Sequence, residues 1–351
     1  MNWTIVPARR FPEFVAHWQA LHAQAGASPL LASEFAGALL DHFAGGRELL
    51  ALHGMPDRPD AMALLAPAGA GRWQTFQPAQ APIGLWLQHP DADTAALARA
   101  LLARLPGLGL VLGLTQCDPE LQARPADGPR VRTLDYIDTA RISIERPFEE
   151  YWQERGKNLR ANLKKQRARL ERDGIKVTLD VLRDPLDVAA AVADYARLES
   201  AGWKAGAGTA VGAADAQGRF YRALLEAFCR RGAGVVYRYR FDERPVAVDL
   251  CVEGPHSIVV LKTTYDETAA QSLSLSPALL MREQACRQLF GERRLRRIEF
   301  YGKVMDWHLR WTDEVRTLYH FNTYRWPILR NWHGRLQARP ACTPSKEQPC
   351  T

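Results

Sequence analysis

A predicted strand that leads directly into the start of a helix is the part of this sequence best suited to chemistry. The strand ends at Tyr265, an acidic loop follows, and Ser276 and Pro277 are the residue types preferred at the N-cap and first position of a helix. Unpaired backbone N–H groups and the positive end of a helix dipole favour an anion such as a diphosphate. An ordinary capped helix has the same signature, so both interpretations stay open.

Side chains able to move a proton occur near this segment. Transfer of an acyl group to an amine or hydroxyl needs a base, a polarised carbonyl and a proton for the leaving group. Tyr265 is the candidate that protonates a leaving sulfur, and its alternative role is packing beside that sulfur. Glu199 and Asp306 are the two candidates for the base, since a carboxylate with a raised pKa would suit that role.

One acid lies in an unusual place, and other catalytic signatures are missing from the sequence. Asp249 stands among apolar strand residues, where we expect an ion pair with an arginine such as Arg238 or Arg240. The nine histidines are scattered without metal-ligand spacing, so no metal site is predicted. No G-x-S-x-G sequence occurs, which leaves a serine hydrolase without support.

The positive charge of the chain is unevenly distributed. The net charge is +7, yet residues 1–130 carry nine basic and eleven acidic side chains, and no lysine precedes Lys157. The segment 155–176 holds nine basic residues and only two acids, with leucines at helical spacing. This basic helix is either a solvated surface helix or a patch for a polyanion, which could be nucleic acid, anionic lipid or a phosphorylated cofactor.

Two further segments carry open alternatives. The glycine-rich loop 202–212 matches neither a dinucleotide fingerprint nor a P-loop. It is either a flexible surface loop or a lid over an acceptor, with Trp203 packing on the substrate and Lys204 binding an anion. The aromatic and arginine-rich segment 307–332 has the composition of a single-strand nucleic-acid binder, but we expect it to pack on the core.

Alternating and helical apolar patterns predict the elements that position these residues. The first half predicts strands and helices in mixed order: strand 3–6, helices 11–25 and from Ser33, strands 49–53, 61–66 and 83–87, a helix from Asp93, and strand 108–114. The second half predicts strand 133–144, one or two helices over 147–173, strand 175–182, helices 185–201 and 217–231, three meander strands at 234–241, 245–253 and 257–265, helix 277–290, and strands 296–300 and 314–321. This order is not the βαβ alternation of a doubly wound nucleotide-binding domain.

The length of 351 residues predicts about two domains. We expect domains at 1–115 and 133–335, a linker at 116–132 and a disordered tail at 336–351. No apolar run is long enough to cross a membrane, and the first residues lack the apolar region of a secretion signal. The six cysteines form no C-x-x-C pair, so we expect reduced thiols in a cytoplasmic protein.

Several stretches resemble one known superfamily. The three-strand meander, its end at 262–266 and the helix start SLSLSPALLM resemble the cofactor-binding core of the GNAT acyltransferases. More narrowly, NLRANLKKQRARL, LESAGWKAGAGTAV and EFYGKVMDWHLRW resemble the bacterial branch named for cellulose-biosynthesis acetyltransferases, which is related to the Fem-type peptidyl transferases. The resemblance covers about residues 140–325, and the first half shows no motif of its own.

The resemblance implies an α+β protein with tandem GNAT-like domains, each a mixed, largely antiparallel sheet flanked by helices, the first of them degenerate. It implies an N-acyltransferase whose donor is acetyl-CoA or another acyl-CoA, with no metal. The donor would enter between the splayed ends of strands 245–253 and 257–265 and the helix from Pro277. The implied cofactor-binding residues are Lys262, Thr263, Thr264, Ser274, Ser276 and Ala278, and the implied substrate-binding residues are Trp203, Lys204, Asp266 and Lys303.

The acceptor implied by the resemblance is an amino group of a sugar, a polysaccharide precursor or a lipid-linked intermediate. One departure from the family pattern opens two alternatives: the stretch 272–278 has none of the glycines that many members place before this helix. The first alternative is a Fem-like transferase that takes its donor from aminoacyl-tRNA, with the basic helix 155–176 contacting tRNA or anionic lipid. The second alternative is a non-catalytic scaffold that binds an anionic partner.

Overall fold

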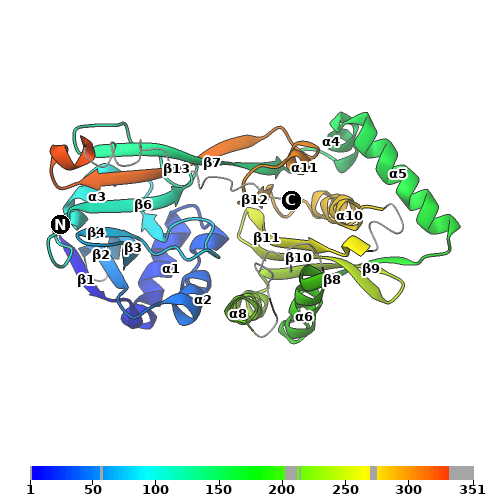
Figure 1. Ribbon diagram of the computed structural model, residues 1–351, viewed down its shortest axis with the longest axis horizontal. Coiled ribbons are helices and arrows are strands. Elements are labelled where there is room, and N and C mark those ends of the chain that lie inside the picture. The colour runs from blue at the N-terminus through cyan, green and yellow to red at the C-terminus, as the bar shows by residue number, and fades with distance from the viewer. Residues whose placement is uncertain (1, 56–57, 202–211, 213–214, 269–274, 332–351) are drawn as a thin grey trace, which may run out of the picture.

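The computed structural model describes residues 2–55, 58–201, 212, 215–268 and 275–331 of the chain (Figure 1). The strands are β1 (Trp3–Pro7), β2 (Leu49–Met55), β3 (Arg58–Pro67), β4 (Arg72–Thr75), β5 (Trp86–Gln88), β6 (Val111–Cys117), β7 (Val131–Ser143), β8 (Val177–Leu182), β9 (Gly234–Phe241), β10 (Arg244–Glu253), β11 (Ser257–Tyr265), β12 (Arg297–Phe300) and β13 (Val315–Tyr324). The helices are η1 (Ala8–Phe14), α1 (Val15–Gln24), η2 (Pro29–Leu31), α2 (Ser33–Phe43), α3 (Thr94–Leu102), α4 (Phe148–Glu154), α5 (Lys157–Arg172), α6 (Pro185–Ala201), α8 (Ala216–Arg230), α10 (Pro277–Glu292) and α11 (Asp306–Leu309).

The described strands form one mixed sheet of 13 strands. Their order is β1-β2-β3-β4-β6-β13-β7-β12-β11-β10-β9-β8, with β5 paired to β3. Most neighbours are antiparallel, and the two parallel pairs are β4 with β6 and β11 with β12. The architecture is therefore the expected α+β class with a largely antiparallel sheet.

The two halves of the sheet repeat one order of elements. In the first half the order is β1, α1, α2, β2, β3, β4, α3 and β6, with the short β5 inserted between β4 and α3. In the second half it is β8, α6, α8, β9, β10, β11, α10 and β12. In each half the long helical crossover joins the two strands of the parallel pair, since such strands need a long connection. The fold is thus a tandem of two similar units.

The helices cover both faces of the sheet. On one face α1, α2, α6 and α8 share a single core cluster that runs through both halves, and α2 packs on α8 through Phe35, Phe43 and Phe220 (Figure 1). On the other face α3 covers the first half, and α4, α5 and α10 cover the second. The two units therefore share a core.

The halves also exchange strands at their junction. The last strand, β13, lies between β6 of the first half and β7, and β7 in turn pairs with β12. Buried ionic contacts reinforce this junction. Arg316 of β13 binds Asp118 at 2.7 Å and Glu299 at 2.8 Å, and the Tyr301 hydroxyl donates to Asp118 at 2.7 Å. The strands β7 and β13 thus link the sheet of the first half to that of the second.

Several boundaries differ from the expectations. The helical stretch 147–173 forms two helices, and its Pro147 is the N-cap of α4. The helix expected from Ser33 does begin there as α2, and Ala32 is its N-cap. The predicted linker 116–132 contains the buried Asp118 and runs from β6 into β7. The predicted tail 336–351 lies outside the described residues.

No helix in the described part of the chain is both long and apolar enough to cross a membrane.

Candidate functional site

A cavity of about 400 Å³ lies at the N-terminal end of α10. The end of β11, the first turns of α10 and the segment around α11 form its walls. The residues that line it are Thr263, Tyr265, Leu275, Ser276, Ala278, Leu279, Arg282, Trp307, Arg310 and Trp311. The volume falls in the range of small-molecule sites, roughly 300–1,000 Å³. Its walls are mainly apolar, with a few polar groups that could orient a ligand.

The cavity lies where two neighbouring strands separate. β11 and β12 pair in parallel only over Ser257–Val259, after which β11 continues to Tyr265. The expected opening between strands 245–253 and 257–265 is wrong, because β10 and β11 pair over their whole length, from Ala247 opposite Tyr265 onward. The opening lies on the other edge of β11, between β11 and β12. The strands of a parallel pair are not joined by a tight turn, so they can separate after a short paired stretch.

The start of α10 offers fewer unpaired amides than the sequence implies. The Ser276 N–H donates to the side chain of Gln166 from α5 at 2.7 Å, and Pro277 has no N–H. The N–H groups of Leu279 and Leu280 both donate to the Ser276 carbonyl. Within the described residues, the Ala278 amide is the one in this turn that lacks a hydrogen-bond partner. Backbone donors alone therefore make a weak anion site here.

A buried ion pair forms the floor of the cavity. The Arg282 guanidinium of α10 lies 2.7 Å from the Asp249 carboxylate of β10, and both are almost fully buried. The Thr263 hydroxyl donates to the same carboxylate at 2.6 Å. Burial raises the pKa of Asp249, and the Arg282 charge opposes this rise. The expected ion pair is present with a different arginine, because Arg238 and Arg240 both bind Asp180.

One wall of the cavity is built from aromatic rings around α11. His308 stacks on Trp307 with ring centroids 3.6 Å apart, and it contacts Phe300 edge-on. Its Nδ1 accepts the backbone N–H of Met305 at 3.0 Å. Burial lowers the pKa of His308 to about 4, and the Arg282 charge adds to this effect. The imidazole is therefore neutral near pH 7.

Four of the residues singled out from the sequence line the cavity. Tyr265 and Thr263 reach it from the end of β11, and Ser276 and Ala278 reach it from the start of α10. Tyr265 is 40% exposed, so a ligand in the cavity can reach its hydroxyl. The strand end and the helix start thus converge on one site.

Lys262 and Thr264 lie on the opposite face of β11. Side chains alternate along a strand, so the residues on either side of Thr263 face α6 and α8. The Lys262 ammonium lies 5.9 Å from the ring centre of Tyr221 in α8, and Thr264 is buried opposite Val248 of the shared core. The structure therefore does not bring Lys262 and Thr264 to the cavity.

Glu199 also lies on the face of α6 and α8. Its buried carboxylate accepts a hydrogen bond from the Tyr195 hydroxyl at 2.8 Å. The pKa of Tyr221 is raised by burial and further by the Glu199 charge, so these groups are close neighbours. The buried Glu199, Tyr195 and Tyr221 and the half-buried Lys262 form a polar cluster, which we call the α6–α8 cluster. The sheet separates it from the cavity.

The remaining residues singled out from the sequence lie elsewhere. Lys303 and Asp306 are exposed and do not line the cavity, although Trp307 beside them does. Asp266 is buried and forms an ion pair with Arg244 at 2.5 Å. Trp203, Lys204 and Ser274 fall outside the described residues.

Six cavity residues were not predicted from the sequence, namely Leu275, Leu279, Arg282, Trp307, Arg310 and Trp311. Arg282 lies four positions after Ala278, on the same helix face, and this spacing is the signal that could have revealed it. Trp307 and Trp311 show the same spacing around α11, with Arg310 beside them. The expectation that segment 307–332 packs on the core is correct for Trp311, which is fully buried. No cluster of metal-ligating residues occurs in the part of the chain that the structure describes.

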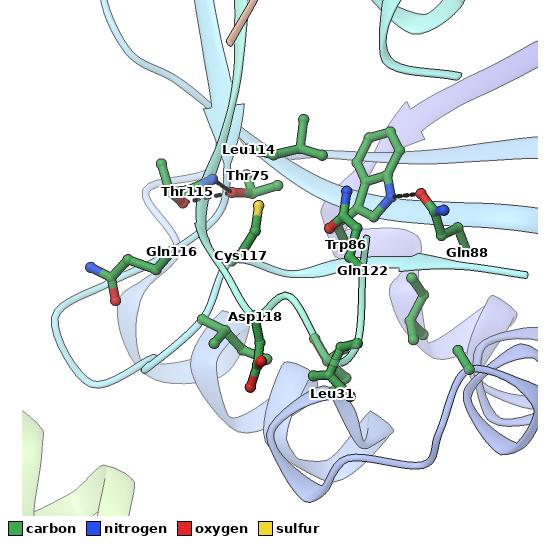
Figure 2. Close-up of a pocket in the computed structure, with 15 residues that line it drawn as sticks. Leu31, Thr75, Trp86, Gln88, Leu114, Thr115, Gln116, Cys117, Asp118 and Gln122 are labelled. Carbon is green, nitrogen blue, oxygen red and sulfur yellow. Dashed lines mark hydrogen bonds between the residues drawn. The ribbon is translucent and has the colours of Figure 1, made fainter. Parts of the chain in front are cut away.

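The first half is closed at the corresponding place, where β4 and β6 separate. Figure 2 shows the Thr75 and Thr115 hydroxyls joined at 2.6 Å and Trp86 donating to Gln88 at 2.8 Å. Gly84 inserts between the strands and donates to the Thr115 carbonyl at 3.0 Å, and a Cβ at Gly84 would collide with Thr75 and Thr115. Only about 20 Å³ of space is left, enough for about one water. The open cavity of the second half has no counterpart here.

Comparisons with known proteins agree with this architecture. Residues 157–309 match the family model of the acetyltransferase (GNAT) domain. No curated protein matches the chain. The C-terminal domain of a protein assigned as a lysylphosphatidylglycerol synthetase, from Agrobacterium fabrum, matches with a TM-score of 0.58 and 13% identity, over 93% of this chain and 97% of that one.

Two other solved structures share the fold at low sequence identity. FemX matches with a TM-score of 0.57 and 9% identity, over 94% of this chain and 99% of that one. A conserved protein of unknown function from Bacteroides thetaiotaomicron matches with a TM-score of 0.55 and 11% identity, over 88% of this chain and 97% of that one. The matched domain contains the β11–α10 cavity apart from Arg310 and Trp311, which follow it directly. Residues 157–309 therefore belong to the acetyltransferase (GNAT) domain family, and the chain shares its fold with FemX.

Proposed function

We propose that this chain is an acyl-CoA-dependent N-acyltransferase, with acetyl-CoA as the first donor to test. The observation that carries the proposal is the cavity where β11 separates from β12 at the start of α10. Its mainly apolar walls suit the arm of a thioester donor, and Arg310 and the Ala278 amide suit its phosphates. The proposed acceptor is an amino group of a sugar, a polysaccharide precursor or a lipid-linked intermediate.

The proposed reaction needs one base and one acid. The acceptor amine attacks the thioester carbonyl carbon, a C–N bond forms, the C–S bond breaks, and the thiolate leaves. We assign proton donation to the leaving sulfur to Tyr265, because its partly exposed side chain lines the cavity. The amine loses its proton to a base as the C–N bond forms.

For the base we favour Glu199 over Asp306. The thioester would lie within the β11–β12 opening, with its sulfur towards Tyr265 on the cavity side and its carbonyl towards the α6–α8 cluster, where Glu199 is buried beside Tyr195 and Tyr221. Glu199 lies in a buried place from which bulk water is excluded, which favours proton transfer from the amine. Asp306 is exposed and lies outside the cavity lining. The acceptor would then approach from the face of α6 and α8.

A transfer assay tests this assignment directly. The protein is incubated with acetyl-CoA and a panel of amino sugars and aminated lipids, and free thiol release is measured. We expect Glu199→Gln and Tyr265→Phe to lower kcat by about 10²–10⁴-fold and Asp306→Asn to stay near the wild-type rate. Full activity of Glu199→Gln would remove Glu199 as the base.

A second candidate function is a Fem-like transferase that uses aminoacyl-tRNA. The observation that favours it is the outer face of α5, where Lys157, Lys164 and Lys165 are exposed and form no ion pair with any described residue. Few unpaired amides occur among the described residues at the start of α10, and this points the same way, because a CoA diphosphate would benefit from more of them. The same face is also suited to anionic lipid.

Binding measurements separate the two candidates. Acyl-CoA binding with weak tRNA binding supports the first candidate. Tight tRNA binding whose affinity falls steeply with salt, with no acyl-CoA binding, supports the second. If neither ligand binds and no thiol is released, both proposals fail for this chain.

A further inference from the structure

We propose that Arg310 is the main anion-binding side chain for the donor and that it contacts the diphosphate of CoA. This inference rests on the proposed acyl-CoA-dependent function. It adds a specificity-determining residue to that function, located on the segment after α11 rather than on the strand–helix loop.

The charges around the cavity single out Arg310. The residues that line it include two arginines and no acid. Arg282 is buried, and its charge is paired with Asp249 at 2.7 Å. The Arg310 side chain is exposed and has no ion pair, hydrogen bond or ring contact with any described residue. Its guanidinium is therefore the uncompensated positive charge at this cavity.

The described backbone at the start of α10 offers few donors for an anion. The Ser276 N–H donates to Gln166 and Pro277 has no N–H, while the Ala278 amide has no partner among the described residues. A diphosphate bound at the mouth of the cavity would therefore gain from a positively charged side chain. Among the residues that line the cavity, Arg310 is placed and charged for this purpose.

The chemistry of arginine fits the task. A guanidinium presents a rigid fork of N–H donors that can bind two phosphate oxygens at once, whereas a lysine ammonium acts as a point charge. Apolar and aromatic residues such as Leu275, Leu279 and Trp307 would contact the uncharged arm of the donor. The cavity is therefore divided into an apolar interior and a charged mouth.

Titration calorimetry with CoA and with pantetheine, which lacks the diphosphate, tests the assignment. We expect Arg310→Gln to raise the Kd for CoA by about 10- to 100-fold and Arg310→Lys to raise it less, while pantetheine binding stays unchanged. Added salt should weaken CoA binding to the wild type more than to Arg310→Gln. Arg104→Gln is the matched control, since Arg104 is exposed and lies in the first half, away from the cavity.

Two results would overturn the inference and can be told apart. If the wild-type protein binds CoA and Arg310→Gln binds it equally well, the Arg310 assignment is wrong and the proposed function stands. If the wild-type protein does not bind CoA, the proposed acyl-CoA function fails and the Arg310 assignment fails with it. Unchanged thermal midpoints of the variants confirm that the comparison is between folded proteins.

Discussion

The buried ion pair of Arg282 and Asp249 sets the stability of the cavity floor. Removing one partner leaves the other charge without compensation in an apolar environment. We therefore expect Arg282→Met to lower the free energy of unfolding by about 3–5 kcal/mol. The double variant Asp249→Asn, Arg282→Met should lower the free energy of unfolding by less, because neither charge is left unpaired. Urea unfolding at pH 7 measures both. A single variant within about 1 kcal/mol of the wild type would contradict this account.

His308 makes the stability of the protein depend on pH. Burial lowers its pKa from 6.5 to about 4, so the unfolded chain binds a proton at this residue at a higher pH than the folded one. This contribution is fully present above pH 6.5 and is lost as the pH falls through 4. When the pH is lowered from 7 to 4, we expect the free energy of unfolding of the wild type to fall by on the order of 3 kcal/mol more than that of His308→Asn. Parallel stability curves for the two proteins would refute it.

Residue types with a local signature could be predicted, and residues defined by their neighbours could not. Tyr265 and Ser276 were identifiable because the end of a strand and a capped helix start have recognisable patterns of consecutive residues. Arg282 and Arg310 are ordinary basic residues in the sequence. Only the packing of α10 against β10, and of α11 near α10, makes one a buried partner and the other an exposed charge.

At the scale of elements, periodicity predicted the order of strands and helices but not which neighbouring strands separate to form the cavity. The meander 234–265 and the helix from Pro277 formed as expected. The sequence predicts an opening between β10 and β11, whereas the structure has it between β11 and β12. Which of these strands stay paired depends on their register. No local pattern in the sequence encodes that register.

The helix α5 tests the distinction between a packed and a solvated face. Leu163 is fully buried against the second-half core, and the adjacent Lys164 is exposed without an ion pair to any described residue. We expect Leu163→Ala to cost about 2–5 kcal/mol in the free energy of unfolding and Lys164→Ala less than about 0.5 kcal/mol. Urea unfolding of the matched pair checks this. Equal losses would mean that α5 does not pack as described.

At the scale of the whole molecule, the two similar units are joined more closely than a linker between domains requires. β13 pairs with β6 and β7, and the core under α1 and α2 continues under α6 and α8. These contacts join residues more than 150 positions apart, such as Asp118 and Arg316, so periodicity and composition could not predict them. The division into domains at 1–115 and 133–335 stays a prediction.

This strand exchange predicts that the units do not fold alone. A fragment of residues 1–130 would expose the unpaired edge of β6, and a fragment of 131–351 would carry β13 without that neighbour. We expect neither fragment to unfold cooperatively on heating and the co-expressed pair to do so. Circular dichroism during a thermal scan measures this. Independent cooperative transitions of the two fragments would contradict the shared fold.

The most direct test of the acyl-CoA account is ligand-dependent thermal stability of the wild type and a variant with a filled cavity. Ala278 lines the cavity, so a tryptophan there would occupy the proposed donor space. We predict that acetyl-CoA at 100 times its Kd stabilises the wild type by about 2.7 kcal/mol and leaves a folded Ala278→Trp variant unchanged. An equal shift in both proteins, or none in the wild type across a panel of acyl-CoAs, would contradict the account.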